Sequence, residues 1–101
     1  MTAVLYSPEL IIESICMQLG LKKSAIIGPL RKRELAECRF LIMYFIQHYT
    51  DLKPHKIGTY LGNRERSTVR YGIESCMDLC KHNPQFKNKF IKVKSKLDNL
   101  K

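Results

Sequence analysis

The 101-residue sequence predicts an all-α domain of about six helices. Its apolar residues recur at intervals of three and four, which is the spacing of an amphipathic helix, and no stretch alternates like a strand. Gly-Pro, Gly-Asn and Asn-Pro pairs, which interrupt helices, separate the periodic stretches. Because 45% of the residues are apolar and no linker or repeat occurs, residues 1–101 are expected to form one domain.

The first two helices are predicted from the residues at their ends. Ser7 is a suitable N-cap, Pro8 fits the first helical position and Gly20 is a natural stop. A short second helix is expected over residues 21–27, because a Gly-Pro pair follows it. The inward stripe of the first helix is expected to consist of Leu10, Ile11, Ile15 and Leu19.

The third helix is expected to begin near residues 31–34, to run to about Tyr49 and to form the centre of the core. Residues 40–46, "FLIMYFI", are apolar nearly all round, which indicates burial on every side. These seven residues are too short for a membrane span, which needs about 20. The rest of the expected stripe consists of Leu35, Cys38 and Tyr49.

Residues 54–80 predict a helix-turn-helix. Pro54 can start a short helix, and Gly62 or Asn63 can take the positive φ that a tight turn needs. A longer helix follows. The expected inward residues are Ile57, Tyr60 and Leu61 in the short helix and Val69, Ile73, Cys76, Met77 and Cys80 in the long one. Because many helical hairpins share this pattern, the pattern by itself is only weak evidence for a DNA-binding motif.

The last helix is predicted to begin with Asn83 as its cap and Pro84 in its first turn. Its inward face is expected to consist of Phe86, Phe90, Val93 and Leu97. Lysines fill the other positions (Lys87, Lys89, Lys92, Lys94 and Lys96). They are interpreted as a solvated face in preference to a binding strip.

The charge balance favours a polyanionic partner. Eighteen Lys and Arg residues against nine acids give a net charge of +9. No signal peptide is recognisable, so a cytoplasmic protein is expected. In such a compartment Cys16, Cys38, Cys76 and Cys80 are interpreted as small core residues. Zinc binding by Cys76, Cys80 and His82 is the disfavoured alternative, because no second ligand pair is near.

The beginning of the longer hairpin helix combines cations with small hydroxyl groups. If Val69 and Ile73 face inward, Arg66, Ser67 and Arg70 face outward. In the usual docking geometry these first turns enter the major groove, where an arginine can bind both acceptors of a guanine. The alternative interpretation is that Ser67 and Thr68 cap the helix and the arginines only solvate it.

Two other basic segments are candidate contacts. The stretch "PLRKRE" places Arg31, Lys32 and Arg33 on a loop, and an arginine on a loop can enter a minor groove. A solvated run of charge before a helix is the alternative. His55 and Lys56, at the start of the short hairpin helix, are expected to contact phosphate, and Lys53 is expected to add positive charge.

The stretch "PHKIGTYLGNRERSTVRYGIESC" resembles the C-terminal DNA-binding domain, domain IV, of the bacterial DnaA replication initiator family. That family has "IG", a Gly-rich turn and then Arg-Asp-His-Thr-Thr-Val. The matching residues are Ile57, Gly58, Gly62, Arg64, Thr68 and Val69, with Glu65 and Ser67 as conservative replacements. The order and spacing of elements are similar from about Pro8 to Leu97. The resemblance implies a Trp-repressor-like fold that binds double-stranded DNA.

The resemblance also implies roles for individual positions. Arg31 falls where the family's basic-loop arginine enters the minor groove. Arg64, Glu65, Arg66, Ser67 and Thr68 fall on the segment that contacts the major groove and phosphates. Arg66 replaces the family's histidine, and Arg70 replaces an apolar residue. We therefore expect either that the domain prefers a different target sequence, with more guanine, or that it binds DNA less selectively.

The sequence favours a binding protein over an enzyme. No nucleophile has a base and an orienting group beside it, and no G-x-x-x-x-G-K-[ST] loop occurs, so neither ATP nor any other cofactor is expected. The expected partner is double-stranded DNA, bound by a monomer or weak dimer in replication initiation or its regulation. Met1 and the unbroken helical plan favour a free-standing protein. A module that binds an acidic protein or an anionic membrane is the alternative function.

Overall fold

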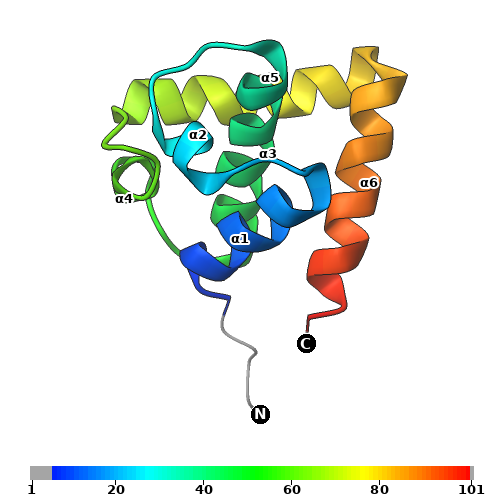
Figure 1. The fold of residues 1–101 in the computed structure, drawn as a ribbon, viewed down its shortest axis with the longest axis horizontal. Coiled ribbons are helices and arrows are strands. Elements are labelled where there is room, and N and C mark those ends of the chain that lie inside the picture. The colour runs from blue at the N-terminus through cyan, green and yellow to red at the C-terminus, as the bar shows by residue number, and fades with distance from the viewer. Residues whose placement is uncertain (1–5, 101) are drawn as a thin grey trace.

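The computed structural model describes residues 6–100, and this part of the chain contains six helices and no strand (Figure 1). The all-α prediction is therefore confirmed. None of the described helices has both the length and the apolar character needed to cross a membrane. The helices are α1 Pro8–Leu19, α2 Lys23–Ile27, α3 Arg33–Tyr49, α4 Pro54–Thr59, α5 Arg66–His82 and α6 Pro84–Asp98.

Local chemistry sets the ends of the first and last helices as predicted. The Ser7 side chain accepts a hydrogen bond of 3.0 Å from the Leu10 amide, and Gly20 ends α1 with a left-handed φ of 69°. The Asn83 side chain accepts a hydrogen bond of 3.0 Å from the Phe86 amide at the start of α6. These side chains satisfy backbone donors that have no partner inside a helix.

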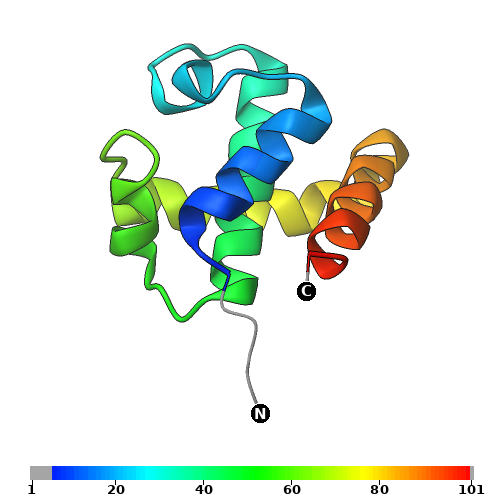
Figure 2. The ribbon, with the colours of Figure 1, turned by 60° about the horizontal axis from the view of Figure 1, so that its bottom comes forward.

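Helix α3 lies at the centre of the molecule, and the other five helices pack on it. Figures 1 and 2 show α5 crossing α3, with α6 turning away where α5 ends. Five residues of α3 have no exposed surface: Cys38, Leu41, Ile42, Phe45 and Ile46. The interior is therefore built around one apolar helix, as the stretch at residues 40–46 indicates.

Two predicted stripes differ from the structure in detail. Leu10 and Met77 were expected to face inward, but they are 40% and 48% exposed. In α1 the buried residues are Ile11, Ile12, Ile15 and Cys16, so the packed face is rotated from the expected one. Met77 lines a groove between α5 and α6, where no other element covers it. The spacing of apolar residues predicts that a segment is helical. It does not predict which side of the apolar stripe the neighbouring helices cover.

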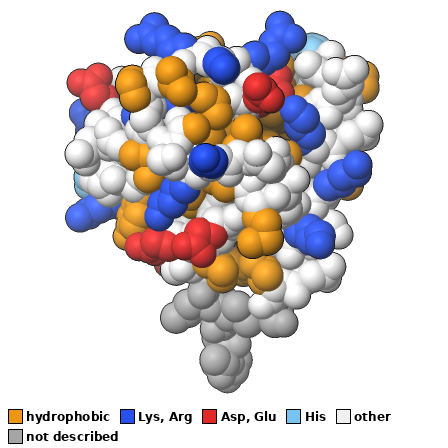
Figure 3. Space-filling model, viewed as in Figure 1, with side chains coloured by type: hydrophobic (Ala, Val, Ile, Leu, Met, Phe, Trp, Pro, Cys, Tyr) orange, Lys and Arg blue, Asp and Glu red, His pale blue; other side chains and the backbone are white. Residues whose placement is uncertain are grey.

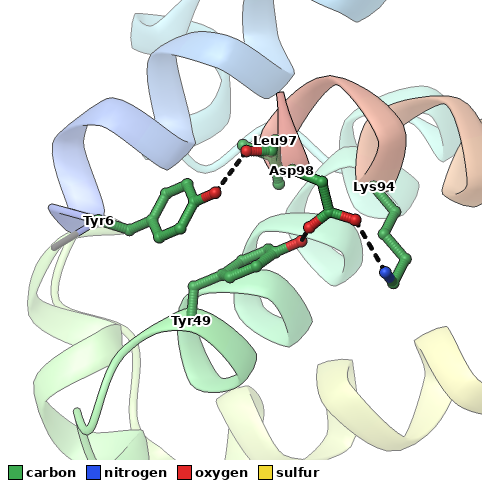
Figure 4. A network of polar contacts seen from close by, with 5 residues as sticks. All are labelled: Tyr6, Tyr49, Lys94, Leu97 and Asp98. Atoms are coloured by element: carbon green, nitrogen blue, oxygen red, sulfur yellow. Dashed lines mark hydrogen bonds and ion pairs between the residues drawn. The ribbon is translucent and has the colours of Figure 1, made fainter. Parts of the chain in front are cut away.

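A polar network ties the end of α6 to the rest of the fold (Figure 4). The Tyr6 hydroxyl donates to the Leu97 carbonyl at 2.5 Å, and the Tyr49 hydroxyl donates to the Asp98 carboxylate. Lys94 also binds Asp98, at 3.0 Å. Burial, with Asp98 as the next cause, raises the pKa of both tyrosines, so their hydroxyls stay protonated donors at neutral pH.

Candidate nucleic-acid interface

Two segments that are distant in the sequence meet on one side of the molecule. They are the connection between α2 and α3, residues 28–32, and the start of α5 with the turn before it. A hollow of about 750 Å³ lies between them. The connection runs along the top of Figure 1, and Figure 3 shows Lys and Arg side chains along the upper edge of the same view. The hollow is lined by residues of both segments and of α3, among them Arg31, Arg39, Phe40, Arg64, Thr68 and Tyr71.

Most of the predicted contact residues are exposed. In the first segment, Arg31 and Lys32 precede α3 and Arg33 is its first residue. In the second, Glu65 is the N-cap of α5, and Arg66, Ser67, Thr68 and Arg70 lie on its outer surface. Lys53, His55 and Lys56 are exposed at the start of α4, and none of them lines the hollow. Arg64 is half-buried.

Arg39 is the buried residue that holds the first segment in place. Only 6% of Arg39 is exposed, although it is charged. Its Nε donates to the Ile26 carbonyl at 2.8 Å, and its Nη2 donates to the carbonyls of Ala25 and Gly28 at 3.0 and 2.9 Å. The last carbonyls of a helix have no partner inside it and carry partial negative charge. The guanidinium therefore caps the C-terminus of α2.

Arg64 binds the same helix end from the other segment. Its Nη2 donates to the Gly28 carbonyl at 2.8 Å, and its Nη1 donates to the Ile27 carbonyl at 3.2 Å and to the Leu61 carbonyl. Together Arg39 and Arg64 bind the four consecutive carbonyls of residues 25–28. Arg64 thus links the loop before α3 to the turn before α5.

The two guanidinium groups are close enough to influence each other. Burial lowers the pKa of Arg39, and the positive charge of Arg64 lowers it further. Burial also lowers the pKa of Arg64. Both groups stay charged, because the ordinary pKa of an arginine side chain lies far above neutrality. The carbonyls at the end of α2 offset this repulsion, and the positive potential of the pair adds to that of Arg31.

The turn between α4 and α5 depends on two close backbone approaches. The Arg64 amide donates to the Gly58 carbonyl at 3.0 Å, and a Cβ on Gly58 would lie 1.9 Å from the Arg64 carbonyl oxygen. Gly62 has a φ of 76°, and a Cβ there would lie 2.3 Å from the Ile27 carbonyl oxygen. Asn63 also has a positive φ, so the predicted turn is confirmed. The close approach of Gly62 to Ile27 packs the turn against the end of α2.

The first turn of α5 presents unpaired backbone donors toward solvent. Its N-cap is Glu65, whose side chain makes no capping hydrogen bond. The alternative in which Ser67 and Thr68 cap the helix is wrong, since both lie inside its first turn. The amides of residues 66–68 have no partner within the helix because they begin it. Amides in this position attract phosphate groups.

Sequence reasoning missed Arg39 and Phe40 and gave Tyr71 no role. Tyr71 is 65% exposed, and its ring meets the edge of Phe40 at 6.1 Å between centroids. This pair forms an apolar side of the hollow. A signal for Arg39 was present, because it stands four residues after Leu35 and three before Ile42, within the buried stripe of α3. An arginine in that position needs buried acceptors.

Comparisons with known proteins match the part of the chain that contains both segments. A family model described as "Bacterial dnaA protein helix-turn-helix" matches residues 8–75. The Chromosomal replication initiator protein DnaA of Synechococcus sp. (strain JA-2-3B'a(2-13)) is 30% identical over 89 residues, which cover 88% of this chain and 19% of the relative. The DnaA protein of Gloeobacter violaceus is 36% identical over 66 residues, covering 65% of this chain and 15% of the relative. This chain thus spans a fifth or less of the length of these relatives.

Proposed function

The chain belongs to the bacterial DnaA helix-turn-helix family, and from this premise we propose that it binds double-stranded DNA. The proposed binding face consists of residues 28–33 together with the start of α5. The observation that carries the proposal is the convergence of these two basic segments across one hollow. Because the matched relatives are named chromosomal replication initiators, the proposed process is replication initiation or its regulation. The domain acts by binding, without catalysis.

The start of α5 is the proposed reader of the major groove. Arg66 is exposed at the first helical position and can donate two hydrogen bonds to a guanine. Ser67 and Thr68 are short, so they allow close approach and contact a phosphate or a thymine methyl group. Arg70, one turn later, adds a phosphate or guanine contact. Glu65 can accept a hydrogen bond from a cytosine amino group.

The loop before α3 is the proposed reader of the minor groove. Arg31 is exposed three residues after Gly28, whose carbonyl is bound by Arg39 and Arg64, so the start of its segment is anchored before DNA binds. The negative potential of a narrow minor groove attracts an arginine held in this way. Lys32 and Arg33 follow on the same segment. Lys53 and Lys56 neutralise phosphates at the start of α4, and His55 contacts a phosphate there. Arg64 contributes by positioning, because its donors bind carbonyls.

Replacing Arg66 by alanine tests the reading of base sequence. We expect Arg66→Ala to reduce discrimination between selected and random duplexes by about 1–3 kcal/mol, the worth of one bidentate guanine contact. Lys56→Ala is the control, since the loss of a phosphate contact weakens binding to all duplexes about equally and lowers the salt slope by about 0.9. Fluorescence anisotropy over a series of salt concentrations measures both quantities.

Two outcomes of that measurement would contradict the proposal. Unchanged affinity and preference in Arg66→Ala would remove α5 as the reading helix. Wild-type affinity that does not fall with salt would exclude phosphate neutralisation as the source of binding.

A further inference from the structure

An apolar groove lies at the other end of α5, where α6 turns away from it. It has a volume of about 650 Å³. Its lining comes from three helices and consists of Tyr44, Met77, Cys80, Phe90 and Ile91, with Lys81 and Lys87. DNA binding as proposed above makes no use of these residues.

The apolar side chains in this groove are unusually accessible. Met77 and Ile91 are 48% and 53% exposed, and Tyr44 and Phe90 are half-buried with their ring centroids 5.2 Å apart. Single exposed apolar residues are normal on protein surfaces. Several around one groove, from separate helices, are typical of a docking surface. The groove therefore offers a partner both an aromatic floor and two accessible aliphatic side chains.

The charge around the groove indicates what kind of partner fits. Among residues 6–100, Lys81 and Lys87 are the only charged residues that line it, and both are exposed. Lys81 lies on α5 and Lys87 on α6, so the two helices that form the groove each contribute one cation. A partner needs carboxylates to meet the lysines and apolar side chains to fill the floor. A nucleic-acid backbone supplies negative charge for the lysines but no apolar side chains for the floor.

We propose that this groove binds an acidic amphipathic helix of a partner protein. Such a helix carries apolar residues at intervals of three and four along one face and places carboxylates on its flanks. It would lie between α5 and α6 as a third helix, with its apolar face on Met77, Phe90 and Ile91. This function is separate from the DNA-binding face.

The two proposed sites lie toward opposite ends of α5. Arg66 and Lys81 are fifteen residues apart on this helix, which corresponds to roughly 22 Å at 1.5 Å per residue. Arg70 and Met77, which are nearest to each other along it, are seven residues or roughly 10 Å apart. The DNA contacts and the groove therefore use different residues of α5.

A pair of synthetic peptides tests the proposal. Both carry leucines at positions i, i+3, i+4 and i+7 of a helix; one has glutamates and the other lysines at the flanking positions. NMR of methyl-labelled protein follows the Met77 and Ile91 methyl groups during titration. We expect the acidic peptide to shift both signals and the basic peptide to shift neither. In Ile91→Glu the affinity for the acidic peptide should fall by about tenfold or more.

Leu10→Glu is the matched control, because it makes the same charge change at an exposed apolar residue that does not line the groove. It should leave the affinity for the acidic peptide nearly unchanged. Equal binding of both peptides, or shifts confined to residues 28–33 and 66–71, would overturn the proposal. So would a duplex DNA that shifts the Met77 and Ile91 methyl groups, because the groove would then bind nucleic acid. None of these readouts requires the DNA proposal to be correct.

Discussion

Arg39→Ala is expected to lower the free energy of unfolding by about 3 kcal/mol or more. The substitution removes hydrogen bonds to the carbonyls of Ala25, Ile26 and Gly28. An acceptor left buried without a donor costs about 1–3 kcal/mol. Relief of the repulsion between Arg39 and Arg64 offsets part of this loss. Urea denaturation followed by circular dichroism measures the difference.

Two further variants identify the cause of the Arg39 effect. Arg39→Lys keeps the charge but presents a single ammonium group, which cannot span three carbonyls, so most of the loss should remain. Arg33→Ala removes an exposed arginine from the same helix and should change stability by about 0.5 kcal/mol or less. If Arg39→Ala were as stable as the wild type, the guanidinium would not hold the end of α2.

Gly58→Ala is expected to have the second large effect. The new Cβ would lie 1.9 Å from the Arg64 carbonyl oxygen, and this backbone atom cannot move without shifting the turn before α5. Overpacking of a well-packed site costs about 1–3 kcal/mol, and here the upper end of that range is expected. For a domain of about 100 residues this corresponds to a melting temperature lower by roughly 12 °C or more. DNA affinity should fall as well, because Glu65 and Arg66 follow the displaced residue.

Thr59→Ala is the control for the Gly58 variant. Thr59 is the next residue of α4, it is exposed, and its hydroxyl donates only to the Lys56 carbonyl. Its replacement should change the melting temperature by a few degrees at most. A Gly58→Ala protein that melts with the wild type and binds DNA equally well would show that this turn does not need the close approach.

The fold was predictable because its signals are local. Ser7 and Asn83 cap the starts of α1 and α6 by accepting hydrogen bonds from amides three residues away, and Gly62 and Asn63 adopt the positive φ of the turn. Because residues 40–46 are apolar on all sides of the helix, α3 is expected to be buried at the centre of the fold. Information of this kind spans a few residues and does not depend on neighbouring elements.

The structure differs from the sequence prediction where distant segments meet. The exposure of Leu10 and Met77 depends on which flank of each helix its neighbours cover. Arg39 and Arg64 resemble other surface cations in the sequence, yet their acceptors lie 11 to 14 and 36 to 37 residues away, apart from Leu61. Periodicity and spacing do not report such contacts. The DNA contacts assigned to Arg31, Arg66 and Arg70 remain predictions that rest on their exposure and on the family.

An NMR titration with duplex DNA tests most directly whether the two basic segments form one binding face. The probe is a duplex selected from a random pool at physiological salt, added to isotopically labelled protein. Amide signals of residues 28, 30–33 and 64–71 should shift together, at the same ratio of DNA to protein, while those of residues 85–97 in α6 stay in place. Shifts confined to the α6 lysines, or shifts in only one of the two segments, would contradict the account.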